Sequence, residues 1–269
     1  MGRLSYVRTA SMTTCKNCKN EFDGAYCNQC GQAAFTPDVN LSFLRQNLVQ
    51  ELIPLDKGIL FTLRGLFTRP GYIVLEYLKG KRVQHVKPLS LVLVLAGIFG
   101  FLVHYFQINL LSGALEVTGS SEGVRSINTY LDKVNNWVGE NYALVCLVQL
   151  PIYAFGTFVM FRRKGYNYAE HFILNAFLTG QRLLLRIVLF PVYYMVNTYG
   201  STKGLSSVIG VAGFLLAIWT LGQFFDQVKK WGLFWRTVMS YVIFYVIFIS
   251  LTTGVAVLMY LYVIKTETV

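Results

Sequence analysis

The chain has 269 residues, of which 54 % are hydrophobic and only 14 % are charged, and its mean hydropathy is positive. These values exclude an ordinary soluble globular protein, because several apolar runs exceed the roughly 18 residues that indicate a transmembrane helix. The net charge of +11 would favour nucleic-acid binding in a soluble chain, but 12 of the 24 Lys and Arg residues precede the first long apolar run. That distribution favours positive-inside topology and anionic membrane lipids as partners, so we do not expect nucleic acid as a partner.

The first fourteen residues contain no apolar core, so we expect no cleavable signal peptide and a flexible N-terminus at 1–14. Two CxxC pairs follow in the segment 15–35, Cys15 with Cys18 and Cys27 with Cys30. Zinc prefers four ligands in a tetrahedron, and two such turns at this spacing predict a zinc ribbon that holds one ion per chain. All four ligands are thiols of the protein, so the expected ion is structural and not catalytic. Two disulfides or a redox-active CxxC are the alternatives, and disulfides require an oxidising compartment.

Segment 36–88 is predicted to hold three amphipathic helices, at 41–53, 57–67 and 72–79, each too short and too charged to span a membrane. Asn40 is the expected N-cap of the first helix, and Pro54 ends it. One interpretation places the helices in the headgroup plane; the other packs them as a cap on the cytoplasmic ends of the spans. In the first, five basic residues face acidic lipids: Arg64, Arg69, Lys79, Lys81 and Arg82.

Five spans are predicted within a transmembrane domain at 89–264, which is followed by a short tail at 265–269: 89–111, 142–161, 172–196, 205–225 and 238–264. Basic residues concentrate before the first span, at 162–164 and at 229–236. Five spans therefore satisfy the positive-inside rule with the N-terminus in the cytoplasm and the C-terminus outside. The expected location is a bacterial inner membrane, and the expected fold is all-α and polytopic.

The third predicted span carries a polar stripe, which includes His171, Asn175, Arg182 and Arg186. Arginine at membrane depth is costly and normally faces a bundle interior or a wet cavity. The stripe therefore suggests a cavity that binds an anionic group such as a lipid phosphate. The alternative is that the arginines reach the cytoplasmic interface or pair with Glu170 or Asp226.

Several motifs together resemble one family of bacterial membrane proteins, the domain of unknown function 3667. The resemblance rests on Cys15-x-x-Cys18, Tyr26-Cys27-x-x-Cys30-Gly31-Gln32, Asp56-Lys57-Gly58, Arg69-Pro70-Gly71, Tyr77-Leu78-x-Gly80-Lys81-Arg82, Lys87-Pro88 and Tyr168-x-x-His171. It implies an N-terminal zinc ribbon followed by an integral membrane domain, and it implies no activity.

No Walker A loop, dinucleotide fingerprint or paired acid and base is found in the sequence, so we expect a protein that is not an enzyme. The leading hypothesis is a membrane scaffold whose zinc ribbon docks a cytoplasmic protein. The alternative is a transporter or lipid-handling protein that uses the polar stripe.

Overall fold

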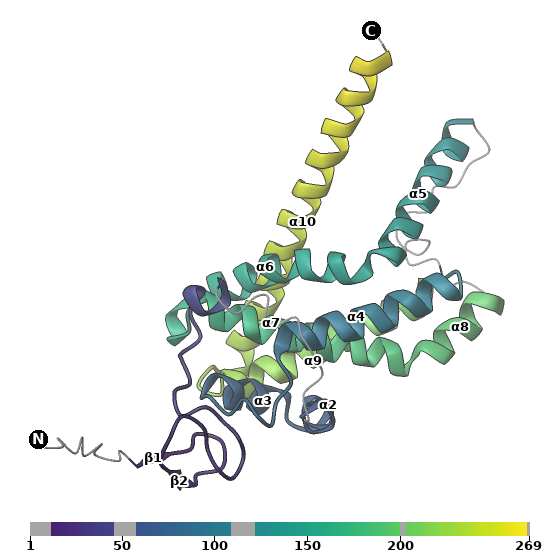
Figure 1. Ribbon diagram of the computed structural model, residues 1–269. Helices are drawn as coiled ribbons and strands as arrows, with labels where there is room; N and C mark the ends of the chain where they lie inside the picture. The colour runs from purple at the N-terminus through teal and green to yellow at the C-terminus, as the bar shows by residue number, and fades with distance from the viewer. Residues whose placement is uncertain (1–11, 46–57, 109–121, 200–202, 268–269) are drawn as a thin grey trace, which may run out of the picture.

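The computed structural model describes residues 12–45, 58–108, 122–199 and 203–267. It shows an all-α polytopic membrane protein with a small two-stranded module at one end of the helical bundle (Figure 1). Strand β1 (Thr13–Thr14) pairs antiparallel with β2 (Glu21–Phe22). The helices are α2 (Ile59–Thr68), α3 (Pro70–Leu78), α4 (Pro88–Tyr105), α5 (Glu122–Glu140), α6 (Tyr142–Phe161), η1 (Arg162–Lys164), α7 (Tyr168–Val188), α8 (Phe190–Tyr199), α9 (Lys203–Phe224) and α10 (Lys230–Glu267).

Among the described residues, four helices are long and apolar enough to cross a membrane: α4, α6, α9 and the first part of α10. The third predicted span is a broken one, because α7 and α8 are separated at Leu189 and bent by 53°. Pro191 explains the break, since it lacks the N–H that would continue the helix and its ring clashes with the preceding turn. Counting the bent pair as one span gives the predicted five.

One helix lies between predicted spans, and one other predicted boundary changes. The segment 112–141 connects the first two predicted spans, and its described part forms α5, which packs on α4 and α6. Leu131, Val134 and Val138 lie on one face of this helix, a periodicity that its polar composition conceals. Helix α10 begins at Lys230, eight residues before the predicted fifth span.

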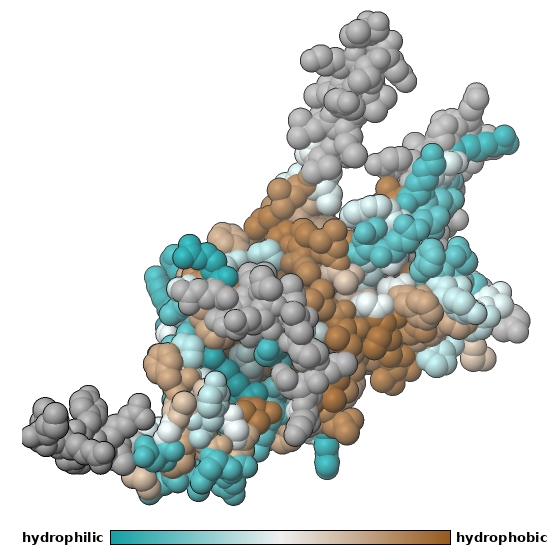
Figure 2. All heavy atoms as spheres, in the orientation of Figure 1, coloured by the Kyte–Doolittle hydropathy of each residue, from teal (hydrophilic) through white to brown (hydrophobic). Residues whose placement is uncertain are grey.

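The connections that were predicted to share the cytoplasmic side lie at one end of the bundle, beside the N-terminal module (Figure 1). Asn167, after the basic turn η1, donates its side-chain N–H to the carbonyl of Val39 at 2.8 Å. Gln223, at the end of α9, accepts a hydrogen bond of 2.9 Å from the backbone N–H of Gly71 in α3. Figure 2 shows hydrophobic residues gathered over the spanning helices and hydrophilic residues over the module and α5, the distribution expected of a membrane domain with polar ends.

Candidate metal centre and its attachment to the membrane domain

The four predicted zinc ligands meet in the N-terminal module. The sulfurs of Cys15, Cys18, Cys27 and Cys30 all lie within 4.8 Å of one another, with Cys15–Cys30 at 3.5 Å and Cys18–Cys27 at 3.6 Å. Tetrahedral zinc with sulfur at 2.3 Å places its ligands about 3.8 Å apart, so the cluster fits such an ion. A disulfide needs about 2.05 Å between sulfurs, and all four residues are free thiols here.

The two CxxC turns are built alike. In the first, the N–H of Lys19 donates to the carbonyl of Cys15 at 3.0 Å; in the second, the N–H of Gly31 donates to the carbonyl of Cys27 at 2.8 Å. Lys19 and Gly31 occupy the same place in their turns and both have positive φ, 67° and 76°. The first turn thus holds a lysine in a conformation that favours glycine.

The surroundings of Cys27 favour the thiolate that a metal requires. Burial raises its pKa, but hydrogen bonds from the backbone N–H groups of Cys30 and Gln29 and from the side chains of Cys18 and Asn20 lower the pKa to about 6. The pKa of the neighbouring Cys18 is raised, against a backbone hydrogen bond from Asn20, by burial and by the other three thiols, so the proton is held on Cys18. A soft set of four sulfurs in this arrangement is typical of zinc or iron. Strand β1 adds Thr13 and Thr14 to the module, which therefore begins two residues before the predicted boundary.

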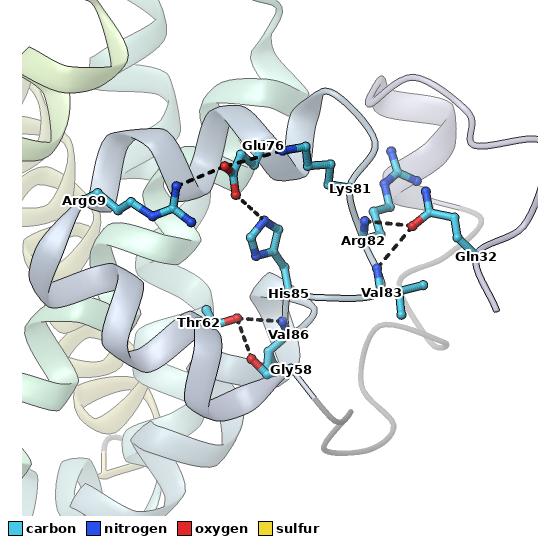
Figure 3. Close-up of polar contacts among 10 residues, drawn as sticks. All are labelled: Gln32, Gly58, Thr62, Arg69, Glu76, Lys81, Arg82, Val83, His85 and Val86. Atoms are coloured by element: carbon cyan, nitrogen blue, oxygen red, sulfur yellow. Dashed lines mark hydrogen bonds and ion pairs between the residues drawn. The ribbon is translucent and has the colours of Figure 1, made fainter. Parts of the chain in front are cut away.

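Gln32 attaches this module to the membrane domain. Its side chain is 4 % exposed and reaches the loop that follows α3, as Figure 3 shows. The side-chain N–H of Gln32 donates to the carbonyl of Gly80, and its oxygen accepts from the N–H groups of Arg82 at 3.2 Å and Val83 at 3.3 Å. One buried amide thus satisfies three backbone groups of the segment that leads into α4.

The same segment contains a charge cluster centred on Glu76 of α3 (Figure 3). Its carboxylate lies 3.2 Å from Arg69, 3.6 Å from Lys81 and 3.3 Å from Nε2 of the fully buried His85. Burial lowers the pKa of His85 to about 4, against the attraction of Glu76, so the ring is neutral near pH 7. The sequence analysis missed Glu76, although it is the single acidic residue between Lys57 and Lys87 and was therefore recognisable as their counter-charge.

Helix α3 packs on the bundle as a cap. Ile73, Val74 and Tyr77 are at most 1 % exposed, and the ring of Tyr77 meets that of Phe177 in α7 edge-on at 5.5 Å. A Cβ atom on Gly71 would stand 2.6 Å from the carbonyl oxygen of Thr220, so glycine permits this approach to α9. The glycine of the Arg69-Pro70-Gly71 motif therefore has a packing role.

Helix α2 buries one side and exposes another, with Leu66 at 1 % and Leu60 at 78 % exposure. The predicted first amphipathic helix is described only at 41–45, where Asn40 caps it through a 2.8 Å bond from Phe43; its remainder lies outside the described residues. Of the five basic residues expected at headgroups, Arg69 and Lys81 contact Glu76, and Arg82 donates to the carbonyl of Pro37 at 2.7 Å. Arg64 and Lys79, the other two, carry no ion pair among the described residues.

The polar stripe of α7 divides into two groups. His171 and Asn175 are buried against Thr157 of α6, with Asn175 donating to its hydroxyl at 2.8 Å and His171 Nδ1 lying 3.2 Å from it. Buried Gln181, outside the predicted stripe, donates to the carbonyl of Leu66 at 2.8 Å. These contacts tie α7 to α6 and α2 and leave His171 and Asn175 closely packed.

Arg182 and Arg186 lie deeper in the bundle among aromatic residues. Arg182 stacks over the ring of Tyr153 at 4.5 Å and donates to the hydroxyl of Tyr241 at 3.4 Å, while Arg186 donates to the hydroxyl of Tyr142. Within the described part of the chain, neither forms an ion pair with Glu170 or Asp226. Tyr153 is eleven residues from the start of α6, about 16 Å along it, so Arg182 lies near the middle of that span.

A comparison with protein families identifies one match, to the family described as "Protein of unknown function (DUF3667)", over residues 56–100. The matched segment holds α2, α3, the loop contacted by Gln32 and most of α4, and the four-cysteine module precedes it. Neither the curated proteins nor the solved structures contain a match to this chain. Over residues 56–100, the segment that joins the module to the membrane domain, the chain is therefore similar to the DUF3667 family.

Proposed function

We propose that this chain is a non-enzymatic scaffold of the bacterial inner membrane whose N-terminal module binds one structural zinc and docks a cytoplasmic protein. The observation that carries the proposal is the contact of Gln32 with Gly80, Arg82 and Val83. A module of this size cannot build a sufficient core by itself, so a metal would supply its folding energy. The contact with the loop would then give the folded module a fixed position on the membrane domain.

The proposed orientation of the protein in the membrane follows from the distribution of its basic residues. The basic turn η1 and the α9–α10 connection, with Lys229 and Lys230, lie at the same end of the bundle as the module. Basic connections stay in the cytoplasm under the positive-inside rule. The zinc module is therefore cytoplasmic in this proposal, and the far end of α10 is outside.

Two surfaces would serve as contacts for partners. The module exposes Tyr26 and Phe35, 68 % and 81 % of whose surfaces are accessible, and exposed aromatic residues are typical of protein-binding surfaces. Helix α2 exposes Leu60 and Phe67 beside Arg64, a combination that suits the headgroup region of an anionic bilayer.

Metal analysis of the purified full chain under reducing conditions tests the proposal. We expect one zinc per chain, lost in Cys27→Ser and retained in Cys146→Ser, because Cys146 lies in α6 outside the cluster. Absence of metal from the wild-type chain would contradict the zinc assignment. One iron per chain in place of zinc would assign the cluster as an iron site.

The alternative function, transport or lipid handling through the third span, is favoured by one observation: Arg186 lines a pocket between the spans.

A further inference from the structure

The pocket beside Arg186 has a volume of about 310 Å³ and is bordered by α4, α5, α6, α7, α8, α9 and α10. This volume lies at the small end of the range for small-molecule sites, about 300–1,000 Å³. Seven residues with polar groups line it: Tyr142, Gln149, Tyr153, Arg186, Tyr193, Ser206 and Tyr245. The pocket thus combines one fixed positive charge with several hydrogen-bonding groups in an apolar bundle.

The charge of Arg186 has no carboxylate partner in the part of the chain that the structure describes. No Asp or Glu lines the pocket, and the two described contacts of Arg186 are its bond to the hydroxyl of Tyr142 and the ring of Phe99 at 5.9 Å. Arg182, one helical turn away, brings a second positive charge to the same region. Buried charge that lacks a partner is costly, so this site favours a ligand that carries negative charge.

The geometry also favours an oxyanion. A guanidinium offers five N–H donors in a planar fork that matches carboxylate and phosphate groups. The hydroxyls of Tyr193 and Ser206 also line the pocket, where they lie 2.8 Å apart and offer further hydrogen-bonding groups.

The α10 side of the pocket is mainly aromatic and reaches the surface of the bundle. Phe244, Tyr245 and Phe248 of α10 form one wall. Tyr245 is 53 % exposed, so this wall borders the surface that would face lipid. An alkyl chain attached to the anionic head could leave the pocket along α10 without losing its apolar surroundings.

We infer that this pocket binds an acidic amphiphile, with its phosphate or carboxylate head on Arg186 and its alkyl chain along α10. The inference is independent of the zinc proposal, because metal content and amphiphile binding are separate measurements. Of the four residues of the predicted stripe, Arg186 contacts the ligand, Arg182 adds charge, and His171 and Asn175 hold the helices together.

Binding to the full chain in a non-ionic detergent tests the inference, with four probes: dodecyl phosphate, dodecanoate, dodecanol and inorganic phosphate. We expect one acidic amphiphile per chain, bound at least tenfold more tightly than dodecanol or inorganic phosphate. Preference for dodecyl phosphate would assign a phospholipid-like head, and preference for dodecanoate a fatty-acid-like head. Equal binding of dodecanol, or binding of inorganic phosphate as tight as that of dodecyl phosphate, would overturn the inference.

The matched variants are Arg186→Gln and Arg163→Gln, since Arg163 is an exposed arginine of η1. We expect a loss of at least tenfold in affinity for the first and none for the second. Val145→Trp provides a second test if Arg186→Gln does not fold. It keeps every charge and fills the pocket, so it should also weaken binding. Unchanged binding in folded Arg186→Gln or in Val145→Trp would overturn the assignment.

Discussion

The side-chain amide of Gln32 donates a hydrogen bond to the backbone carbonyl of Gly80, 48 residues along the chain. Gln32 directly follows the second CxxC turn, and Gly80 follows α3, so this bond joins the candidate metal centre to the segment that is similar to the DUF3667 family. The candidate metal-binding module is therefore attached to the membrane domain through the side chain of Gln32.

Gln32→Leu should loosen the module from the membrane domain. The change leaves the buried carbonyl of Gly80 and the partly buried N–H groups of Arg82 and Val83 without their partner, at a cost of about 1–3 kcal/mol. Chymotrypsin cleavage at Phe35, the last residue of the module, should accelerate at least about fivefold. Gln29→Leu is the matched control, because Gln29 is exposed, and it should leave the cleavage rate unchanged.

Changes at the two equivalent turn positions should move zinc affinity in opposite directions. Gly31→Ala forces a side chain into the left-handed region at a cost of about 1 kcal/mol, whereas Lys19→Gly removes the same strain. Folding of the module is linked to metal binding, so affinity should fall about fivefold in the first and rise about fivefold in the second. Competition with a chromophoric chelator measures both, and a shift in the same direction would refute the equivalence of the turns.

Gly71→Ala should displace α3 from α9. The new methyl group would stand 2.6 Å from the carbonyl oxygen of Thr220, and overpacking of this kind costs about 1–3 kcal/mol. Thermal unfolding in detergent should show a lower midpoint for Gly71→Ala. Gly97→Ala in α4 is the control, because no atom lies within 4 Å of its added Cβ, and an equal loss in both variants would contradict the packing role.

Acid should destabilise the Glu76 cluster through His85. The pKa of this ring is lowered from 6.5 to about 4 in the folded state, so the unfolded chain binds more protons between these values and stability falls as pH decreases through them. The full pKa shift corresponds to about 3 kcal/mol of unfolding free energy. None of it is lost above pH 6.5, where His85 is neutral in both the folded and the unfolded chain. His85→Leu should flatten the unfolding free energy between pH 6.5 and 4.

The control for that measurement is His104→Leu, since the His104 side chain is 54 % exposed. It should keep the wild-type pH dependence. A wild-type curve that is flat over this range would show that His85 is not held neutral by burial.

The sequence predicted the features that depend on local pattern. Cysteine spacing predicted the sulfur cluster, and run length predicted the spans, because both are set within one short segment. The attachment through Gln32 could not be predicted in this way, since its partners lie about 50 residues further along the chain. The sequence shows Gln32 directly after Cys30-Gly31, but a single polar residue there carries no information about what it contacts.

The bend within the third span and the separate roles of the stripe residues could not be predicted, for the same reason. Pro191 lies in the predicted third span, but a proline alone does not specify the angle of 53° between α7 and α8. Likewise, the four stripe residues share one face of α7, yet their neighbours in α6 and α10 decide which of them border a pocket. Tertiary contacts between distant segments, which local periodicity does not encode, separate packing residues from ligand-binding residues.

Hydrogen exchange of the Arg82 and Val83 amides, measured in the full chain with and without its metal, tests the attachment most directly. Both amides donate to Gln32, whereas the amide of Val86 donates to Thr62 at 3.0 Å, within the membrane domain, and serves as an internal reference (Figure 3). If a metal-folded module holds Gln32 in place, metal removal should accelerate exchange at Arg82 and Val83 and leave Val86 protected. Unchanged exchange at Arg82 and Val83 after complete metal removal would contradict the account.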